Sequence, residues 1–356
     1  MEARGHPPLP NDRILVFGPT VWTSFKPATK LKVFAAEARA GGLSNQPPAD
    51  NSFNRIPIPP RLSLTWMQTL EASSTVQALS EKQRRALISL LADEDPGVYH
   101  LIRTRLLSYG PGVEDWLRPE GLNNDPTIRR RVRELLDYWA RIRADERFME
   151  FCRCQGDGLD LERAVFLLGQ TRHPQSNTEA YLALLDSWGE EARERTGRVV
   201  SAESKLGELH QFIFKELEFD GAILHGQDPD CSYLNRVMER RAGNPIGLCA
   251  IYLFLARRAR LPVAGIGLPT HFICRYQSPT AEIYIDCFRR GALLTRAECI
   301  QYLLQSNESL SDAHLAPVTG RRILLRMCRN LVATYGHLED SEEAMRIQRY
   351  VRLLSN

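Results

Sequence analysis

The sequence predicts an α+β protein, a mainly helical chain whose few strands form one small sheet near residue 275. Apolar residues recur at helical spacing through most of the chain after Leu62. Two short segments, 271–276 and 282–288, carry strand signals. The turn-forming residues 277–280 lie between them and indicate an antiparallel hairpin. The length of 356 residues suggests about two domains with additional segments.

The charge balance argues against two classes of partner. The chain has 46 lysines and arginines against 43 aspartates and glutamates, a formal net charge of +3. This balance offers no electrostatic basis for binding nucleic acid or a membrane surface. The longest apolar stretch, residues 246–256, is shorter than the about 20 residues that cross a bilayer. We therefore expect neither a nucleic acid nor a membrane as partner.

The eight cysteines are scattered and show no disulfide framework. Cys152 and Cys154 are separated by one residue, and no second pair follows at zinc-finger spacing, so the sequence predicts no metal site. Cys274, Cys287 and Cys299 are expected to be small buried hydrophobes. The N-terminus lacks the apolar core of a secretory signal. We expect free thiols in a reducing cytoplasm, and no cofactor.

The first 150 residues divide into an arm and a helical domain. Residues 1–60 hold ten of the 21 prolines and are predicted to be an irregular, Pro-rich arm. Residues 61–150 contain a repeat, in which Asp-Pro pairs at Asp95 and Asp125 precede apolar residues at helical spacing. The pattern resembles HEAT-type helical hairpins, although their period is nearer 40 residues. The alternative is that these two Asp-Pro pairs open unrelated helices and form no repeat.

Helices are also predicted on both sides of the hairpin. Three helices precede it, each opened by a capping residue: Asp160, Asn177 and Ser201. Asn244 and Pro245 then open a strongly apolar helix that extends to about Arg260. The tail is predicted to be a helix pair broken at Gly336, with the second helix opening at Asp340.

One group of residues could carry chemistry: Cys249 on the apolar helix, His271 on the first strand and Asp286 on the second. In a Cys-His-Asp triad the histidine takes the thiol proton, and the aspartate fixes the tautomer and orientation of the imidazole. The hairpin can place His271 and Asp286 side by side. Alternatively, Cys249 is a packed hydrophobic thiol, and His271 with Asp286 is a structural pair between adjacent strands.

These motifs resemble the transglutaminase-like core of the bacterial SirB-type proteins, a domain also found in certain eukaryotic F-box proteins. The residues that carry the resemblance are Arg-Ala-Gly-Asn-Pro-Ile at 241–246, Pro-Thr-His-Phe at 269–272 and the strand that ends in the aspartate. The resemblance covers about residues 161–354. It implies a papain/transglutaminase-like domain with a helical lead-in over 151–315, and a tetratricopeptide-like helical tail over 316–356.

The resemblance also identifies a departure from the catalytic pattern. In catalytic transglutaminases the nucleophilic cysteine lies two residues after a glycine, where helix-terminal N–H groups lower the pKa of its thiol. The equivalent position after Gly243 is Pro245, and Cys249 lies about one turn deeper. We therefore expect a regulatory or scaffolding protein that binds an unknown protein or peptide partner. The alternative is a cysteine-dependent peptidase or acyl-transferase that uses Cys249, His271 and Asp286.

Overall fold

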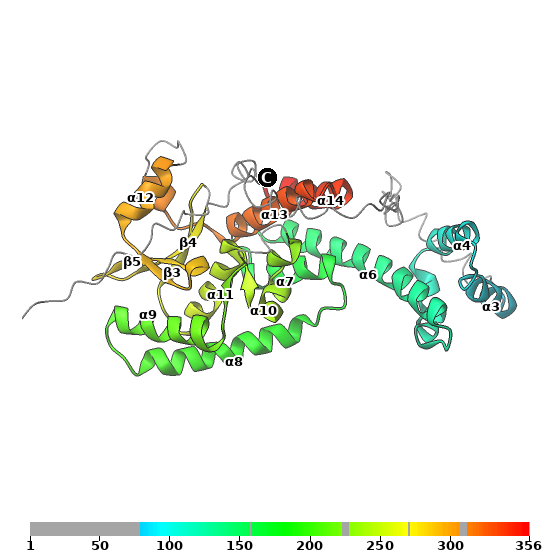
Figure 1. Ribbon diagram of the computed structural model, residues 1–356, viewed down its shortest axis with the longest axis horizontal. Helices are drawn as coiled ribbons and strands as arrows, with labels where there is room; N and C mark the ends of the chain where they lie inside the picture. The colour runs from blue at the N-terminus through cyan, green and yellow to red at the C-terminus, as the bar shows by residue number, and fades with distance from the viewer. Residues whose placement is uncertain (1–78, 157, 223–227, 270, 306–311, 356) are drawn as a thin grey trace, which may run out of the picture.

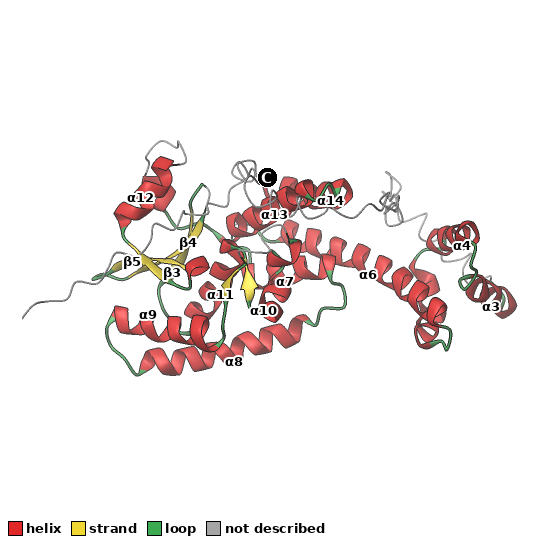
Figure 2. Ribbon diagram, viewed as in Figure 1, coloured by secondary structure: helices red, strands yellow, loops and turns green. Residues whose placement is uncertain are grey.

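The computed structural model describes residues 79–355, apart from 157, 223–227, 270 and 306–311. The predicted arm, residues 1–60, lies outside the described residues. The first helices lie at one end of an elongated molecule, and the long helix α6 (Pro126–Cys154) leads from them toward the sheet at the other end (Figure 1). Helices dominate the structure and strands are few, as the sequence predicts (Figure 2).

The N-terminal helical block contains both helices that Asp-Pro pairs open. Its elements are α3 (Glu81–Leu90), α4 (Pro96–Ser108), η3 (Pro111–Val113), α5 (Glu114–Leu117), η4 (Arg118–Leu122) and the first half of α6. Asp95 caps α4 by accepting a 2.7 Å hydrogen bond from the N–H of Gly97. Asp125 caps α6 in the same way, through a 2.7 Å bond from the N–H of Thr127. Both predicted helix starts are therefore confirmed.

Helix α6 joins this block to the rest of the molecule. The block has a hydrophobic core of its own, which includes Leu91, Ile102, Leu106, Val132, Leu135 and Trp139. Beyond that core α6 continues without interruption through residue 150, where the sequence placed a domain boundary. Its last buried residues, Phe148 and Cys152, pack in the main core of the protein. One helix thus contributes to two cores.

The lead-in to the sheet consists of helices and short connecting elements. The helices α7 (Leu161–Arg172), α8 (Thr178–Gly197) and α9 (Ala202–His210) begin at the predicted caps, whose side chains accept hydrogen bonds from backbone N–H groups. They are followed by η5 (Gln211–Glu216), β1 (Asp220–Gly221), η6 (Pro229–Cys231), α10 (Leu234–Arg240) and β2 (Ala242–Gly243). Strands β1 and β2 pair in parallel immediately before the apolar helix. Within the described residues every helix is too short or too polar to traverse a bilayer.

The apolar helix α11 (Pro245–Arg258) packs on a four-stranded antiparallel sheet. The strands β3 (Val263–Gly267), β4 (Phe272–Gln277), β5 (Glu282–Asp286) and β6 (Ala292–Leu294) follow one another in spatial order. Strands β4 and β5 form the predicted hairpin, which is confirmed. The register places Cys274 opposite Ile285.

The two faces of the sheet pack in different hydrophobic clusters because side chains alternate along each strand. Phe272, Cys274 and Ile285 face the main core with α11. Ile273 and Tyr284 belong instead to a second cluster with residues of α12 (Arg296–Gln305), including Cys299, Tyr302 and Leu303. The short turn η7 (Cys287–Arg289) follows β5 in the chain, and the turn η8 (Asp312–Leu315) comes after α12.

The tail is a helix pair, but its break differs from the prediction. Helix α13 (Gly320–His337) includes Gly336, and the chain turns after it, where Glu339 has a φ of 58°. Helix α14 (Ser341–Ser355) then opens as predicted, because Asp340 accepts a 3.1 Å hydrogen bond from the N–H of Glu343. A glycine is tolerated inside a helix at a cost of about 1 kcal/mol, so its presence alone does not end one. The prediction that Gly336 breaks the pair was therefore wrong.

Candidate functional site

The start of helix α11 is closed by a side-chain cap. Asn244 Oδ1 accepts a 2.9 Å hydrogen bond from the N–H of Gly247, and Asn244 Nδ2 donates to Ser232 Oγ at 2.8 Å. Pro245 is the first helical residue and has no N–H to offer. Both residues therefore suit a stable helix start, and Pro245 brings no nucleophilic atom to it.

Cys249 lies one turn deeper in α11 and is completely buried, with 0% of its surface exposed. Its thiol donates a hydrogen bond to the backbone carbonyl of Phe272, with the sulfur 3.5 Å from the oxygen. Burial raises the pKa of this thiol well above its ordinary value, because the apolar surroundings penalise the thiolate. Cys249 is therefore held in the protonated, poorly nucleophilic form.

His271 and Asp286 are brought together, as the hairpin prediction requires. Nε2 of His271 lies 2.9 Å from Oδ2 of Asp286, and both residues are buried. The two atoms are close but not aligned as donor and acceptor, and neither has a hydrogen-bond partner among the described residues. The other carboxylate oxygen of Asp286 accepts hydrogen bonds from the N–H groups of Phe288 and Arg289, at 3.0 and 3.3 Å.

Cys249 and the His271–Asp286 pair make different contacts, although the ring of His271 also lies edge-on to Phe288 of the main core, with centroids 6.4 Å apart. The ring of His271 stacks on Tyr302 of α12, with centroids 5.7 Å apart and planes 19° from parallel. His271 and Asp286 have the strand parity of Ile273 and Tyr284, which pack on the α12 side. Cys249 packs in the main core on the α11 side. Its hydrogen bond goes to the carbonyl of Phe272 rather than to the imidazole of His271.

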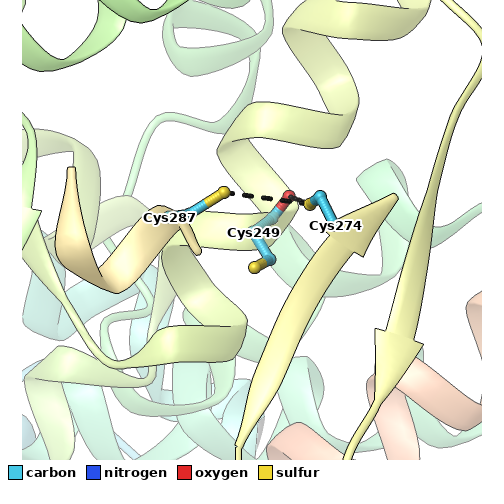
Figure 3. A group of neighbouring side chains, drawn as sticks. All are labelled: Cys249, Cys274 and Cys287. Atoms are coloured by element: carbon cyan, nitrogen blue, oxygen red, sulfur yellow. Dashed lines mark hydrogen bonds between the residues drawn. The ribbon is translucent and has the colours of Figure 1, made fainter. Parts of the chain in front are cut away.

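Three of the buried cysteines converge, which the sequence analysis missed. The sulfurs of Cys249, Cys274 and Cys287 all lie within 4.8 Å of one another. Figure 3 shows them approaching from α11, β4 and the turn η7. The Cys287 thiol donates to Cys274 Sγ at 3.8 Å, and the Cys274 thiol donates to the carbonyl of Cys249 at 3.9 Å. Strand pairing between 274 and 285 was the signal available, since it brings 287 close to 274.

The expectation that Cys274, Cys287 and Cys299 are buried is confirmed. All eight cysteines lie within the described residues and are free thiols, and Cys154 is the exposed one. Burial raises the pKa of Cys287 well above its ordinary value, as it does for Cys249. Burial also works to raise the pKa of Cys274, but the interactions with the two neighbouring thiols outweigh that effect and lower it.

Comparisons with known proteins place the chain among relatives that share this domain. Residues 179–329 match the transglutaminase-like superfamily. A UPF0162 protein of Xylella fastidiosa (strain Temecula1) is 30% identical over 205 residues, which cover 56% of this chain and 73% of the relative. Protein SirB1 of Salmonella typhimurium is 28% identical over 94 residues, or 26% of this chain and 35% of SirB1.

A eukaryotic relative shares a segment of intermediate length. F-box only protein 21 of Homo sapiens is 28% identical over 152 residues, which cover 40% of this chain and 24% of that protein. No solved structure is a significant match. The residues that match the superfamily, 179–329, contain the helix, hairpin and aspartate strand described above. The chain therefore belongs to the transglutaminase-like family that includes the UPF0162 proteins and SirB1.

Proposed function

We propose that this protein is a regulatory or scaffolding protein whose transglutaminase-like domain binds a protein or peptide partner without thiol chemistry. The observation that carries this proposal is the burial of Cys249, whose thiol donates to a backbone carbonyl. Reactive cysteines are partly exposed and have a lowered pKa, whereas the pKa of Cys249 is raised. Pro245, at the start of α11, supplies no nucleophile in its place.

The proposal includes an architecture and a location. We infer HEAT-like helical hairpins in the N-terminal block and a tetratricopeptide-like pair in α13 and α14. In both segments, consecutive helices pack through their apolar side chains. The eight free thiols support a cytoplasmic location. The modest net charge of +3 supports a protein or peptide partner in preference to nucleic acid.

A pocket of about 500 Å³ between α5, α6 and the α7–α8 connection is the surface that we propose for the partner. Its apolar lining includes Leu136 and Pro174, and its charged lining consists of Glu114 with three arginines: Arg118, Arg143 and Arg147. Glu114 is buried and paired with Arg118 and Arg143, each through a nitrogen 3.1 Å from Oε2. Three guanidinium groups against one carboxylate leave a positive lining, which suits an acidic peptide.

Peptide binding tests this proposal directly. The full chain is titrated into a fluorescent Glu-rich peptide, with a Lys-rich peptide of equal length as control, and anisotropy is recorded. We expect the Glu-rich peptide to bind, Arg147→Glu to weaken binding at least tenfold, and Cys249→Ser to leave it unchanged. Arg153→Glu, at an exposed arginine further along α6, is the matched charge control and should retain binding. Equal binding of both peptides, or loss of binding in Cys249→Ser, would contradict the proposal.

The close approach of His271 and Asp286 favours a second candidate, a cysteine-dependent peptidase or acyl-transferase. Cys249 would give its proton to His271 and attack an amide carbonyl, and the amine would leave with that proton as the thioester forms. This requires a rearrangement that exposes Cys249 and brings it to the imidazole. Mass spectrometry of the chain after incubation with an activated acyl ester tests it. The enzyme candidate predicts one acyl group on Cys249, and acylation elsewhere or not at all rejects it.

A further inference from the structure

Three thiols that come from separate parts of the fold meet in the main core. Cys249 belongs to α11, Cys274 to the middle of β4, and Cys287 to the turn after β5. Each has 0% of its surface exposed. We propose that Cys249, Cys274 and Cys287 form a binding site for one thiophilic d¹⁰ metal ion, Zn²⁺ or Cu⁺, which ties the helix to the sheet.

The sulfur separations fit a shared metal ion. A Zn–S bond of about 2.3 Å places two tetrahedral thiolate ligands about 3.8 Å apart. The sulfurs of Cys274 and Cys287 are 3.8 Å apart, and no pair in the group exceeds 4.8 Å. The sulfurs therefore need to approach one another by at most about 1 Å to coordinate one ion. Side-chain rotation within the core can provide such a shift without moving a strand.

The ligand set determines the kind of ion. Within the described residues the group contains three thiols and no imidazole or carboxylate. Thiolate ligands select Cu⁺ and Zn²⁺ over the hard cations Mg²⁺ and Ca²⁺, which prefer oxygen. Three sulfurs can complete a trigonal Cu⁺ site, whereas Zn²⁺ takes a fourth ligand. Two carbonyl oxygens are already next to the group: that of Phe272, 3.5 Å from Cys249 Sγ, and that of Cys249, 3.9 Å from Cys274 Sγ.

Binding is an exchange of protons for metal, with no oxidation or reduction. Each thiol loses its proton as its sulfur forms a bond to the ion, so three protons are released for each ion bound. The resulting complex has a charge of −1 with Zn²⁺ and −2 with Cu⁺. A cation lies on the same side of the core, where the guanidinium of Arg326 is 5.7 Å from the ring centroid of Phe272, the residue whose carbonyl accepts from the Cys249 thiol.

The buried charges around the group favour the metal complex with the smaller negative charge. Either complex would add negative charge near Asp286, which opposes it, and near Arg326, which offsets part of it. The zinc complex adds the smaller charge. Charge thus favours Zn²⁺, whereas the number of sulfur ligands favours Cu⁺. Metal analysis of the protein decides which of the two ions binds.

Metal analysis of the full chain tests the site. The protein is unfolded and refolded without oxygen in the presence of Zn²⁺ or Cu⁺, excess ion is removed, and the metal content is measured by mass spectrometry. We expect about one equivalent of one of these ions per chain. Cys249→Ser and Cys274→Ser should each reduce it to less than a tenth of an equivalent. Cys328→Ser, at another completely buried cysteine, is the matched control and should keep the full equivalent.

Cobalt substitution provides a readout that needs no variant. Co²⁺ bound by thiolates gives sulfur-to-cobalt charge-transfer bands in the near ultraviolet, so these bands in the wild-type chain would support the site even if a serine variant failed to fold. Wild-type chain that retains less than a tenth of an equivalent of either ion would overturn the proposal. It would also be overturned if Cys328→Ser, while still folded, lost as much metal as the two site variants. Neither result bears on peptide binding at the arginine-lined pocket.

Discussion

His271 Nε2 approaches Asp286 Oδ2 to 2.9 Å in a region from which water is almost excluded. Asp286 also accepts hydrogen bonds from two backbone N–H groups of the turn η7, so the pair connects the start of β4, the end of β5 and that turn. Such contacts hold the ends of the two central strands together whether or not a thiol reaches the imidazole. The contribution of Asp286 to stability can therefore be measured separately from any catalytic role.

Substitution of Asp286 should be costly for stability. Asp286→Ala leaves the N–H groups of Phe288 and Arg289 without their acceptor, and a buried unsatisfied group costs about 1–3 kcal/mol. Asp286→Asn retains a side-chain oxygen that can accept the same bonds and should cost less. Urea unfolding followed by circular dichroism measures both. Equal losses of unfolding free energy in the two variants would show that the side-chain oxygen does not stabilise the protein by accepting these hydrogen bonds.

Two arginines of α14 share one carboxylate but should differ in their contribution. Nη1 of Arg346 lies 2.8 Å from Asp145 Oδ1, and Nη2 of Arg349 lies 3.2 Å from Asp145 Oδ2. The side chain of Arg346 is 11% exposed and that of Arg349 is 53% exposed. Arg346→Met should lower the free energy of unfolding by up to about 3–5 kcal/mol, because it removes the most buried cation from the partly buried carboxylates of Asp145 and Glu343. Arg349→Met should cost less than about 1 kcal/mol. Similar values from chemical denaturation would refute this assignment of the tail contacts.

His210 should make stability depend on pH. Its Nε2 is 3.0 Å from the hydroxyl of buried Tyr252, and burial lowers the pKa of its imidazole from 6.5 to about 4. Between these values the unfolded chain binds a proton that the folded protein does not, so stability present above about pH 6.5 is lost as the pH falls toward 4. The loss should reach about 3 kcal/mol. His210→Gln should flatten this part of the profile of unfolding free energy against pH. His100→Gln, at an exposed histidine, should leave it unchanged, and a profile that His210→Gln does not alter would exclude His210 as the cause.

The local features of the fold could be predicted from the sequence. Helix caps at Asp95, Asp125 and Asp160 act on N–H groups two or three residues away, so their signal is contained in a short segment. The signal for the hairpin of β4 and β5 is also contained in a short segment, because the two strands and their turn are consecutive in the sequence. The break after α13 was misplaced because a glycine marks a helix end only when the backbone needs a positive φ, and here Glu339 adopts it instead of Gly336.

The arrangement of the candidate site depends on packing that no short segment specifies. Cys249, Cys274 and Cys287 lie far apart in the sequence and meet because α11 packs across β4 and the turn η7. The orientation of His271 follows from α12, which covers the opposite face of the sheet and places Tyr302 against the imidazole. The sequence contains the three residue types of a triad. Their spacing along the chain does not determine which face of the sheet each side chain occupies.

The rate at which the Cys249 thiol is alkylated in the folded protein tests most directly the proposal that this domain works without thiol chemistry. Iodoacetamide is added near neutral pH, and labelled cysteines are identified over time by peptide mass spectrometry. We predict that exposed Cys154 reacts first, that Cys249 reacts only after denaturation, and that His271→Ala changes neither rate. Labelling of Cys249 before Cys154 in the folded chain, slowed by His271→Ala, would contradict the proposal and establish the cysteine enzyme in its place.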